Sequence, residues 1–362
     1  MTAKVKAQPL RSLSDAGPVA RMYRKYLGRA SLTILAVVIL SAYLLPLLYM
    51  AMTAFQQPGQ SSTPGAPVYP AKPQTGIYQG QDYPIFTVTI DGAQRELMLV
   101  KKGREQSTFV DPKDPSATLI PWTGRWRTLA QSWTFSPAIE NFTTTWSQLN
   151  FPRLLFNTAA IAVLSTVGAV ASSALVAYGF ARFRFPGRNL LFVLLLGTII
   201  LPFQVTLIPQ YVIFQQAGLV NTFVPLILPK LLATEAFFVF LIVQFMRGIP
   251  RELDEAAIID GCSVYRTFWH VVLPLSKPAL VTTSIFTFIW TWNDFFTQMV
   301  YLNDTEKFTV PLGLRLFVDT SSESNFGAMF AMSALALVPI VLFFLAFQRL
   351  LVEGVSTSGL KG

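Results

Sequence analysis

The chain has 362 residues, of which 52% are hydrophobic and only 13% are charged, and its mean hydropathy is +0.47. A soluble domain of ordinary composition carries roughly 25% charged residues, so this chain has too few to cover a globule in water. The apolar residues also form long blocks, which indicates an integral membrane protein. The single cysteine, Cys262, excludes an intrachain disulfide and a cysteine-based metal cluster, and we expect neither a metal site nor a catalytic residue.

The net charge of +9 is compatible with a nucleic-acid partner, but the placement of the basic residues favours another interpretation. Seven of the 28 Lys and Arg residues lie in the first 29 positions, ahead of the first apolar block. Others lie in short connections between apolar blocks, where positive charge is typical of cytoplasmic loops. We therefore expect membrane lipid, and no nucleic acid, as a partner.

Six apolar segments are long enough to cross a hydrocarbon core, which takes about 20 helical residues. In chain order they are Ser31–Met52, Leu154–Val176, Leu190–Phe214, Thr222–Phe245, Leu280–Val300 and Gly327–Phe347. The first follows a basic segment without a clear small-residue cleavage site, so we interpret it as an uncleaved span. The predicted fold is an all-α polytopic membrane protein with six transmembrane helices. Its predicted parts are a basic N-terminal segment (1–30), the first helix (31–53), an insert (54–151), a core with helices two to six (152–350) and a C-terminal tail (351–362).

Basic residues in the connections predict the orientation of the chain. With the N-terminus in the cytoplasm, the inner segments hold sixteen Lys and Arg residues, whereas the short outer loops hold two, Lys307 and Arg315. We therefore expect both termini in the cytoplasm. Prolines interrupt the third predicted span at Pro202 and Pro209, which indicates that this span is kinked.

The insert between the first two spans differs in composition from the rest of the chain. It opens with a run rich in Pro, Gly and Ser, residues 57–76, which is typical of a linker. Alternating apolar stretches follow at Phe86–Ile90 and Glu96–Val100, around the Asp91-Gly92 pair that favours a β-hairpin. We predict a small β-containing insert on the extracytoplasmic side, either a partner-binding element or an elaborated loop.

The segment after the fourth span contains signals for two short helices that meet at a glycine. Glu252 and Asp254 fill the first turns of one helix, where acidic side chains favour the helix dipole. Gly261 ends that helix, and Ser263 is a cap for a second one. We expect the second helix to run to Leu273, before Pro274 breaks the chain.

This elbow also carries a motif. Glu255-Ala256-Ala257, then Gly261, then Leu273-Pro274 resemble the EAA-x3-G-x9-I-x-LP signature of permease subunits of ABC importers, with Val271 in the isoleucine position. The extended form EAAIIDG is similar to the carbohydrate-uptake, maltose-type branch. The resemblance covers spans two to six and the C-terminus, and the long insert departs from it.

The resemblance implies specific contacts for a cytoplasmic coupling loop, residues 248–276. The residues expected to contact an ATPase subunit are Glu255, Ala256, Ala257, Asp260 and Gly261. The C-terminal segment is similar to the tail of maltose-type permeases, which implies that Gly359 and Lys361 face the ATPases. An alternative interpretation of the elbow is an amphipathic interfacial helix without a partner.

The implied assembly lies in a bacterial or archaeal plasma membrane. It contains a second permease subunit, most simply in a heterodimer, two ATPase subunits, and an extracytoplasmic solute-binding protein that delivers a small solute such as a sugar. The pattern G-x4-G-K-[ST] has no match here, because Gly359 is followed by Leu360. This chain is therefore expected to be no enzyme and to bind no cofactor, with ATP and magnesium on the partner ATPase.

Polar and aromatic residues within the spans are candidates for the substrate pathway, since ionisable groups are costly there. Glu235 lies five residues after Lys230, and the alternative is an interfacial pair in which the lysine reaches toward water. Trp290, Asn293 and Asp294 resemble a Trp-Asn-Asp element of the family, and rings that stack on sugar faces beside amides suit a carbohydrate. For the neighbouring Trp292, the aromatic belt at the outer interface is the favoured interpretation.

The rival function from another class is an ion-coupled secondary transporter without ATPase subunits. Such a protein is expected to show repeated halves and buried charges coupled to ion binding. The sequence has no clear internal repeat and few charges within its spans. The coupling-loop signature therefore favours the importer.

Overall fold

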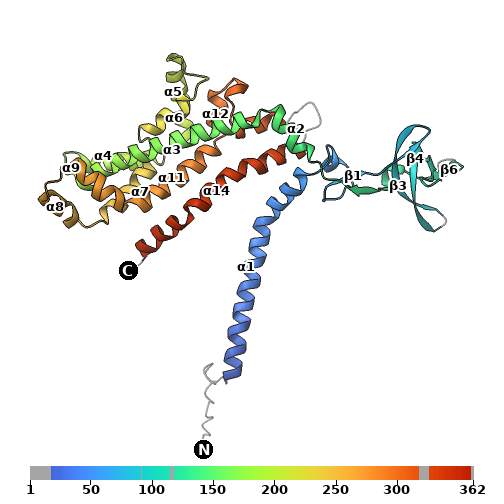
Figure 1. Cartoon of the computed structure of the whole chain (residues 1–362), viewed down its shortest axis with the longest axis horizontal. Coiled ribbons are helices and arrows are strands. Elements are labelled where there is room, and N and C mark those ends of the chain that lie inside the picture. The colour runs from blue at the N-terminus through green and yellow to red at the C-terminus, as the bar shows by residue number, and fades with distance from the viewer. Residues whose placement is uncertain (1–17, 91, 115–117, 318–325, 360–362) are drawn as a thin grey trace, which may run out of the picture. The chain divides into compact units, whose positions relative to one another are not determined.

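The structure is a computed structural model that describes residues 18–90, 92–114, 118–317 and 326–359 (Figure 1). The chain divides into two units, Met1–Met52 and Thr53–Gly362. The first unit contains most of helix α1 (Pro18–Ala54). The second contains a β insert followed by a helical region that carries the candidate site.

The helical region is built from elements of very different length. In chain order they are α2 (Glu140–Gln148), α3 (Phe151–Arg182), α4 (Arg188–Thr198), α5 (Phe203–Gln216), α6 (Val224–Leu231), α7 (Ala236–Arg247), α8 (Glu252–Ile259), α9 (Val264–Thr267), the π-helix η3 (Phe268–Val272), α10 (Leu273–Leu275), α11 (Lys277–Trp292), α12 (Phe296–Tyr301), the 3-10 helix η4 (Thr305–Lys307), α13 (Val310–Leu314), the 3-10 helix η5 (Arg315–Phe317) and α14 (Phe326–Gly359).

Four helical segments are long and apolar enough to cross a membrane. They are Tyr26–Ala54, Phe151–Arg182, Val224–Arg247 and Phe326–Gln348. Two further pairs pass the same test only together, because they are bent: α4 with α5 by 97°, and Val264–Leu275 with α11 by 74°. The predicted helical membrane protein is thereby confirmed, with four to six candidate spans among the described residues.

The first bent pair agrees with the predicted kink in the third span, whereas the fifth predicted span differs from the structure. The third predicted span, Leu190–Phe214, turns at residues 199–202, where Pro202 precedes α5. Proline disfavours helical backbone at the residue before it, so the helix stops there, whereas Pro209 stays inside α5. The fifth predicted span, Leu280–Val300, is wrong at its end, since α11 stops at Trp292 and a separate α12 follows.

The insert contains the predicted β structure. Its main sheet has the order β2 (Thr75–Tyr78), β3 (Gln81–Ile90), β4 (Ala93–Lys101), β5 (Gln106–Val110), β6 (Ile120–Thr123), and β7 (Ala130–Gln131) pairs with β3. A second sheet pairs β1 (Ala71–Pro73) with β8 (Trp133–Phe135), and the short 3-10 helices η1 (Gln60–Ser62) and η2 (Trp126–Thr128) lie beside these strands.

The predicted hairpin is present as β3 and β4, whose last pair, Ile90 with Ala93, leaves a two-residue turn. Asp91 of that turn lies outside the described residues, and Gly92 has a φ of 78°, which glycine adopts without strain. Phe86, Val88, Leu97, Leu99 and Phe109 alternate along the strands and form the core of the insert.

The interpretation of residues 57–76 as a linker is wrong. The side chain of Gln60 is 2% exposed, and its amide nitrogen donates to the carbonyls of Pro67 and Tyr69 at 2.9 and 2.8 Å. Its amide oxygen accepts from the backbone of Ala71 at 3.1 Å. The same oxygen accepts from the backbone of Gln57 at 3.3 Å. A buried glutamine with four partners orders this segment, because each of its polar groups is satisfied by neighbouring backbone.

Helix α3 is the centre of the helical region and packs against α6, α7 and α11 (Figure 1). The residues that it buries are mostly small, including Ala162, Ser165, Gly168, Ala169 and Ser173. Small residues permit close approach of helices. Membrane helices depend on such close packing because the surrounding lipid is as apolar as their side chains, so the hydrophobic effect does not drive them together.

Candidate functional site

The predicted elbow is present, and a Schellman motif ends its first helix, α8. The backbone N–H of Cys262 donates to the carbonyl of Ala257 at 2.9 Å, and that of Gly261 donates to Ile258 at 3.0 Å. Gly261 has a φ of 80°, and beyond its two chain neighbours no described residue has an atom within 4 Å of the position that a Cβ would occupy there. The glycine is therefore required by backbone conformation and not by crowding within this chain.

The second arm of the elbow begins as expected but continues past the predicted end. The Ser263 hydroxyl accepts from the backbone N–H of Arg266 at 3.3 Å and caps α9. Helical backbone then continues through η3 into α10, so the prediction that Pro274 breaks the chain is wrong. Pro274 lies in the first turn of α10, directly after a π-turn, where its missing N–H is tolerated. The chain bends after Leu275 instead.

The elbow is fastened to the end of α3 by an ion pair. Nε of Arg182 lies 2.9 Å from Oδ2 of Asp254, and the two side chains are 6% and 17% exposed. The terminal nitrogens of Arg182 both donate to the carbonyl of Ile249 at 3.3 Å. Removing one partner of a buried ion pair typically costs about 3–5 kcal/mol, because the other charge is left buried without compensation, so the attachment of the first arm depends on both side chains.

An aromatic contact fastens the second arm to the same helix. The hydroxyl of Tyr178 donates to the carbonyl of Val264 at 3.3 Å, and its ring lies 4.8 Å from that of Phe268. Phe268 and Val272 belong to one buried cluster with residues of α3 and α7. Both arms are thus attached to α3.

The predicted contact residues occupy the free side of the elbow, with one exception. Glu255, Ala256, Asp260 and Gly261 are exposed, whereas Ala257 is 7% exposed and packs inward. Large apolar side chains accompany the exposed residues: Ile258, Ile259 and Tyr265 are 58%, 85% and 68% exposed. Acidic groups beside exposed apolar side chains form a surface suited to another protein.

The predicted pathway residue Glu235 lies at a break inside a candidate span. It precedes α7 and forms an ion pair with Lys230, the penultimate residue of α6. Between them Ala233 has a φ of 54°, and the hydroxyls of Thr234 and Ser172 donate to carbonyls at the end of α6. The backbone groups released by the break are therefore partly satisfied, as irregular backbone within a membrane requires.

Trp290 lies on α11 beside this break and is 51% exposed. Its ring stacks on Phe238 at 5.4 Å and lies 5.6 Å from Phe286. Trp292 is different: it is 3% exposed and packs with Ala162 of α3, so its assignment to an interfacial aromatic belt is wrong. Successive residues of a helix point in different directions, which separates the two rings.

Asn293 and Asp294 lie at the junction between α11 and α12 and not within a continuous helix. The side-chain amide of Asn293 donates to the carbonyl of Ile289 at 2.8 Å, while Oδ1 of Asp294 accepts from the backbone of Thr297 at 3.0 Å. Each side chain satisfies a group at a helix end, which explains why the fifth predicted span stops here.

The structure describes only one of the two C-terminal residues that are predicted to face the ATPases. Gly359 is the last residue of α14, and Lys361 lies outside the described residues. Their orientation toward ATPase subunits stays a prediction. Within the described ranges, no three His, Cys, Asp or Glu side chains lie close enough together to hold a metal ion.

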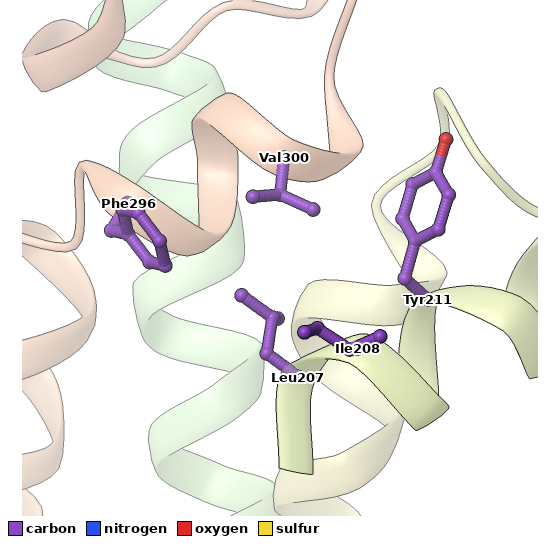
Figure 2. Close-up of a pocket in the computed structure, with 5 residues that line it drawn as sticks. All are labelled: Leu207, Ile208, Tyr211, Phe296 and Val300. Carbon is purple, nitrogen blue, oxygen red and sulfur yellow. The ribbon is translucent and has the colours of Figure 1, made fainter. Parts of the chain in front are cut away.

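A cavity of about 350 Å³ lies between α5 and α12 (Figure 2). Leu207, Ile208, Phe296 and Val300 face one another across it, while the hydroxyl of Tyr211 points away. A solute site needs a few convergent polar groups to orient its ligand. This apolar cavity is therefore a poor candidate for the binding of a hydrophilic solute.

The anchoring residues Arg182 and Tyr178 could not be identified from the sequence as part of the site. Both lie in the last turns of α3, about 70 residues before the elbow. The only signal was an arginine and a tyrosine at the end of an apolar span, which is equally typical of an interfacial anchor.

The helical spans, the charged and aromatic groups at breaks within them, and an exposed elbow attached to a central helix define a transport permease. A family model described as binding-protein-dependent transport system inner membrane component matches residues 166–357. The match covers more than half of the chain, and the chain belongs to this family.

Characterised relatives agree with this assignment. The trehalose/maltose transport system permease protein MalG of Thermococcus litoralis is 34% identical over 63% of this chain and 83% of its own. The arabinooligosaccharides transport system permease protein AraQ of Halalkalibacterium halodurans is 35% identical over 57% of this chain and 73% of its own. The sn-glycerol-3-phosphate transport system permease protein UgpE of Yersinia pestis is 34% identical over 67% and 83%.

The fold also has a counterpart among solved structures. A crystal structure of a bacterial ABC transporter involved in the import of the acidic polysaccharide alginate contains a similar chain, with a TM-score of 0.62 and 18% identity. The similarity covers 94% of this chain and 99% of that one. An alignment over 94% of this chain must include part of the insert, so the fold of this chain is shared with that protein.

Proposed function

We propose that this chain is one permease subunit of an ATP-driven importer for a carbohydrate or a related small solute, and that its elbow receives the ATPase. The main support for this proposal is the geometry of the elbow. It presents Glu255, Ala256, Asp260 and Gly261 on an exposed surface while its two arms are fastened to α3. A surface held this firmly passes an applied displacement on to the spans instead of absorbing it.

The proposed topology has six transmembrane helices, with both termini and the elbow in the cytoplasm and the insert outside the cell. The distribution of basic residues supports this orientation, since the inner segments hold sixteen and the short outer loops two. The pair α4–α5, bent by 97°, then counts as one span, whereas Val264–Leu275 of the second pair belongs to the elbow and only α11 enters the membrane.

The proposed partners are a second permease subunit in a heterodimer, two ATPase subunits that bind ATP and magnesium, and an extracytoplasmic solute-binding protein. Membership of a binding-protein-dependent transport family supports the last of these. The relatives named for trehalose and maltose, arabinooligosaccharides and glycerol phosphate support a hydroxyl-rich solute.

The mechanism follows from differential binding. A ligand shifts a conformational equilibrium only by the difference in its affinities for the two states. In the proposed cycle, ATP-bound ATPases and loaded binding protein both favour the outward-open state, and hydrolysis releases it. The role of this chain is to bind the moving partner at its elbow and to line half of the pathway.

The proposed pathway runs along the break between α6 and α7 and the exposed face of α11. Glu235 supplies a charge that accepts hydroxyl donors, and Trp290 supplies a ring on which a sugar face can stack. Asn293 and Asp294 lie at the end of the same helix, α11. A half-buried ion pair is costly in lipid, which supports contact of this face with water or with the second permease.

The experiment is the double variant Gly261→Asp with Glu255→Lys in the intact transporter. We expect normal membrane insertion together with loss of solute uptake and of ATPase association. Gly218→Asp is the matched control, since Gly218 also has a positive φ of 69° and open surroundings but lies in another loop. Normal uptake and ATPase binding in the double variant contradict the proposal.

Co-purification separates the two classes of transporter. The importer requires an ATPase and a second permease to purify with this chain under mild conditions. Uptake by this chain alone, driven by an ion gradient, establishes the secondary transporter instead.

A further inference from the structure

Helix α3 is continuous, whereas several segments that pack around it are interrupted. It has 32 residues, which corresponds to a length of about 48 Å at the rise of an α-helix. Its only proline, Pro152, lies in the first turn, where proline is accommodated. The segments α4–α5, α6–α7 and α11–α12 that surround it are all divided by breaks. Among these core elements, α3 is the one suited to carry a displacement along its length.

The outer end of α3 is attached to the connection between α12 and α13. The side-chain amide of Asn157 donates to the carbonyls of Glu306 and Phe308 at 3.0 and 2.9 Å. The backbone N–H of Val310 donates to the hydroxyl of Thr158 at 2.9 Å. Asn157 and Thr158 are 5% and 1% exposed, so these bonds are made away from water, where a lost partner is costly.

The inner end of α3 is attached to the elbow through Arg182 and Tyr178, as described above. One straight helix is thereby fastened at both ends to segments that are distant in sequence. Its middle also touches the break in the proposed pathway, because the hydroxyl of Ser172 donates to the carbonyl of Lys230 at 3.2 Å.

We propose that α3 is a strut that transmits movement of the elbow to the outer segment 302–310, with Arg182 and Asn157 as the positioning residues at its two ends. The mechanical connection is a property of this chain alone. The proposed function enters only in the statement that this connection transmits closure of the ATPases to the outer face. Coupling between two sites is reciprocal, so loosening either end is expected to affect both segments.

Hydrogen exchange on the purified full-length chain in lipid nanodiscs tests the strut without any partner. The variants are Arg182→Gln at the inner end and Asn157→Leu, similar in size, at the outer end. Each is expected to accelerate amide exchange at its own end and, by about twofold to thirtyfold, in the distant segment. Thr166→Val is the control, since the hydroxyl of Thr166 is buried in α3 but donates within its own helix, to Ala162.

A change confined to the altered end in both variants overturns the strut. If either variant fails to fold, Arg182→Lys and Asn157→Ser replace it, with smaller effects of the same pattern expected. In the assembled transporter, Asn157→Leu is expected to retain basal ATP hydrolysis and lose its stimulation by the binding protein. Stimulation at the wild-type level contradicts the use of the strut in coupling, whereas absence of an ATPase from the wild-type complex contradicts the proposed function alone.

Discussion

Replacing Gly261 by alanine separates the backbone requirement of the elbow from its role as a contact surface. The residue has a φ of 80°, a conformation in which a Cβ collides with the following carbonyl at a cost of roughly 1–2 kcal/mol. Apart from its two chain neighbours, no residue in the described ranges has an atom within 4 Å of the new Cβ, so no packing term adds to this strain. We expect the Schellman bonds of Gly261 and Cys262 to open about 5 to 30 times more often.

Hydrogen exchange of these two amides in the purified chain measures the opening directly. Gly261→Asn is the companion variant, because asparagine tolerates left-handed backbone better than alanine does. We expect it to exchange more slowly than the alanine variant, although its side chain is larger. ATPase binding in the complete transporter is expected to rank the two variants in the opposite order. If the ATPase packs on this surface, the asparagine variant binds it less well than the alanine variant, because the larger side chain obstructs the contact. Equal exchange in the wild type and both variants refutes the assignment of Gly261 as a conformational requirement.

Three further outcomes are expected. A Cβ at Gly168 lies 2.7 Å from a leucine side chain of α6, so Gly168→Ala should destabilise the chain by about 1–3 kcal/mol. Gly179→Ala has open surroundings in the same helix and should raise the thermal midpoint slightly, because alanine favours helix over glycine. Lys230→Met leaves the carboxylate of Glu235 half-buried without its cation, and the double variant Lys230→Met with Glu235→Leu should recover stability but not uptake in a transport assay. Trp290→Ala removes an exposed ring and should raise the KM for uptake with little change in protein yield, while Trp290→Phe retains most of the affinity.

Local signals made the elbow predictable. Gly261 as a helix terminator and Ser263 as a cap act within a few residues of themselves, and the structure places both as expected. The β-hairpin of the insert was predictable for the same reason, since an apolar alternation and a two-residue turn are short-range features. The end of the second arm was not predictable in the same way. The sequence predicts that the helix ends before Pro274, but a π-turn directly before this proline lets the helical backbone continue.

By itself the sequence determined that lipid is the solvent of this protein, where its apolar segments lie and which signature its elbow displays. Those properties follow from composition, from segment length and from motifs in which all the residues are neighbours. Only the tertiary structure decided that Arg182 holds Asp254, that Asn157 holds the outer segment, and that Trp290 is exposed while Trp292 is buried. These contacts join residues from distant parts of the chain or depend on which face of a helix meets its neighbour. Such pairings arise from the packing of α3 against elements from several distant parts of the chain, and no local pattern specifies them.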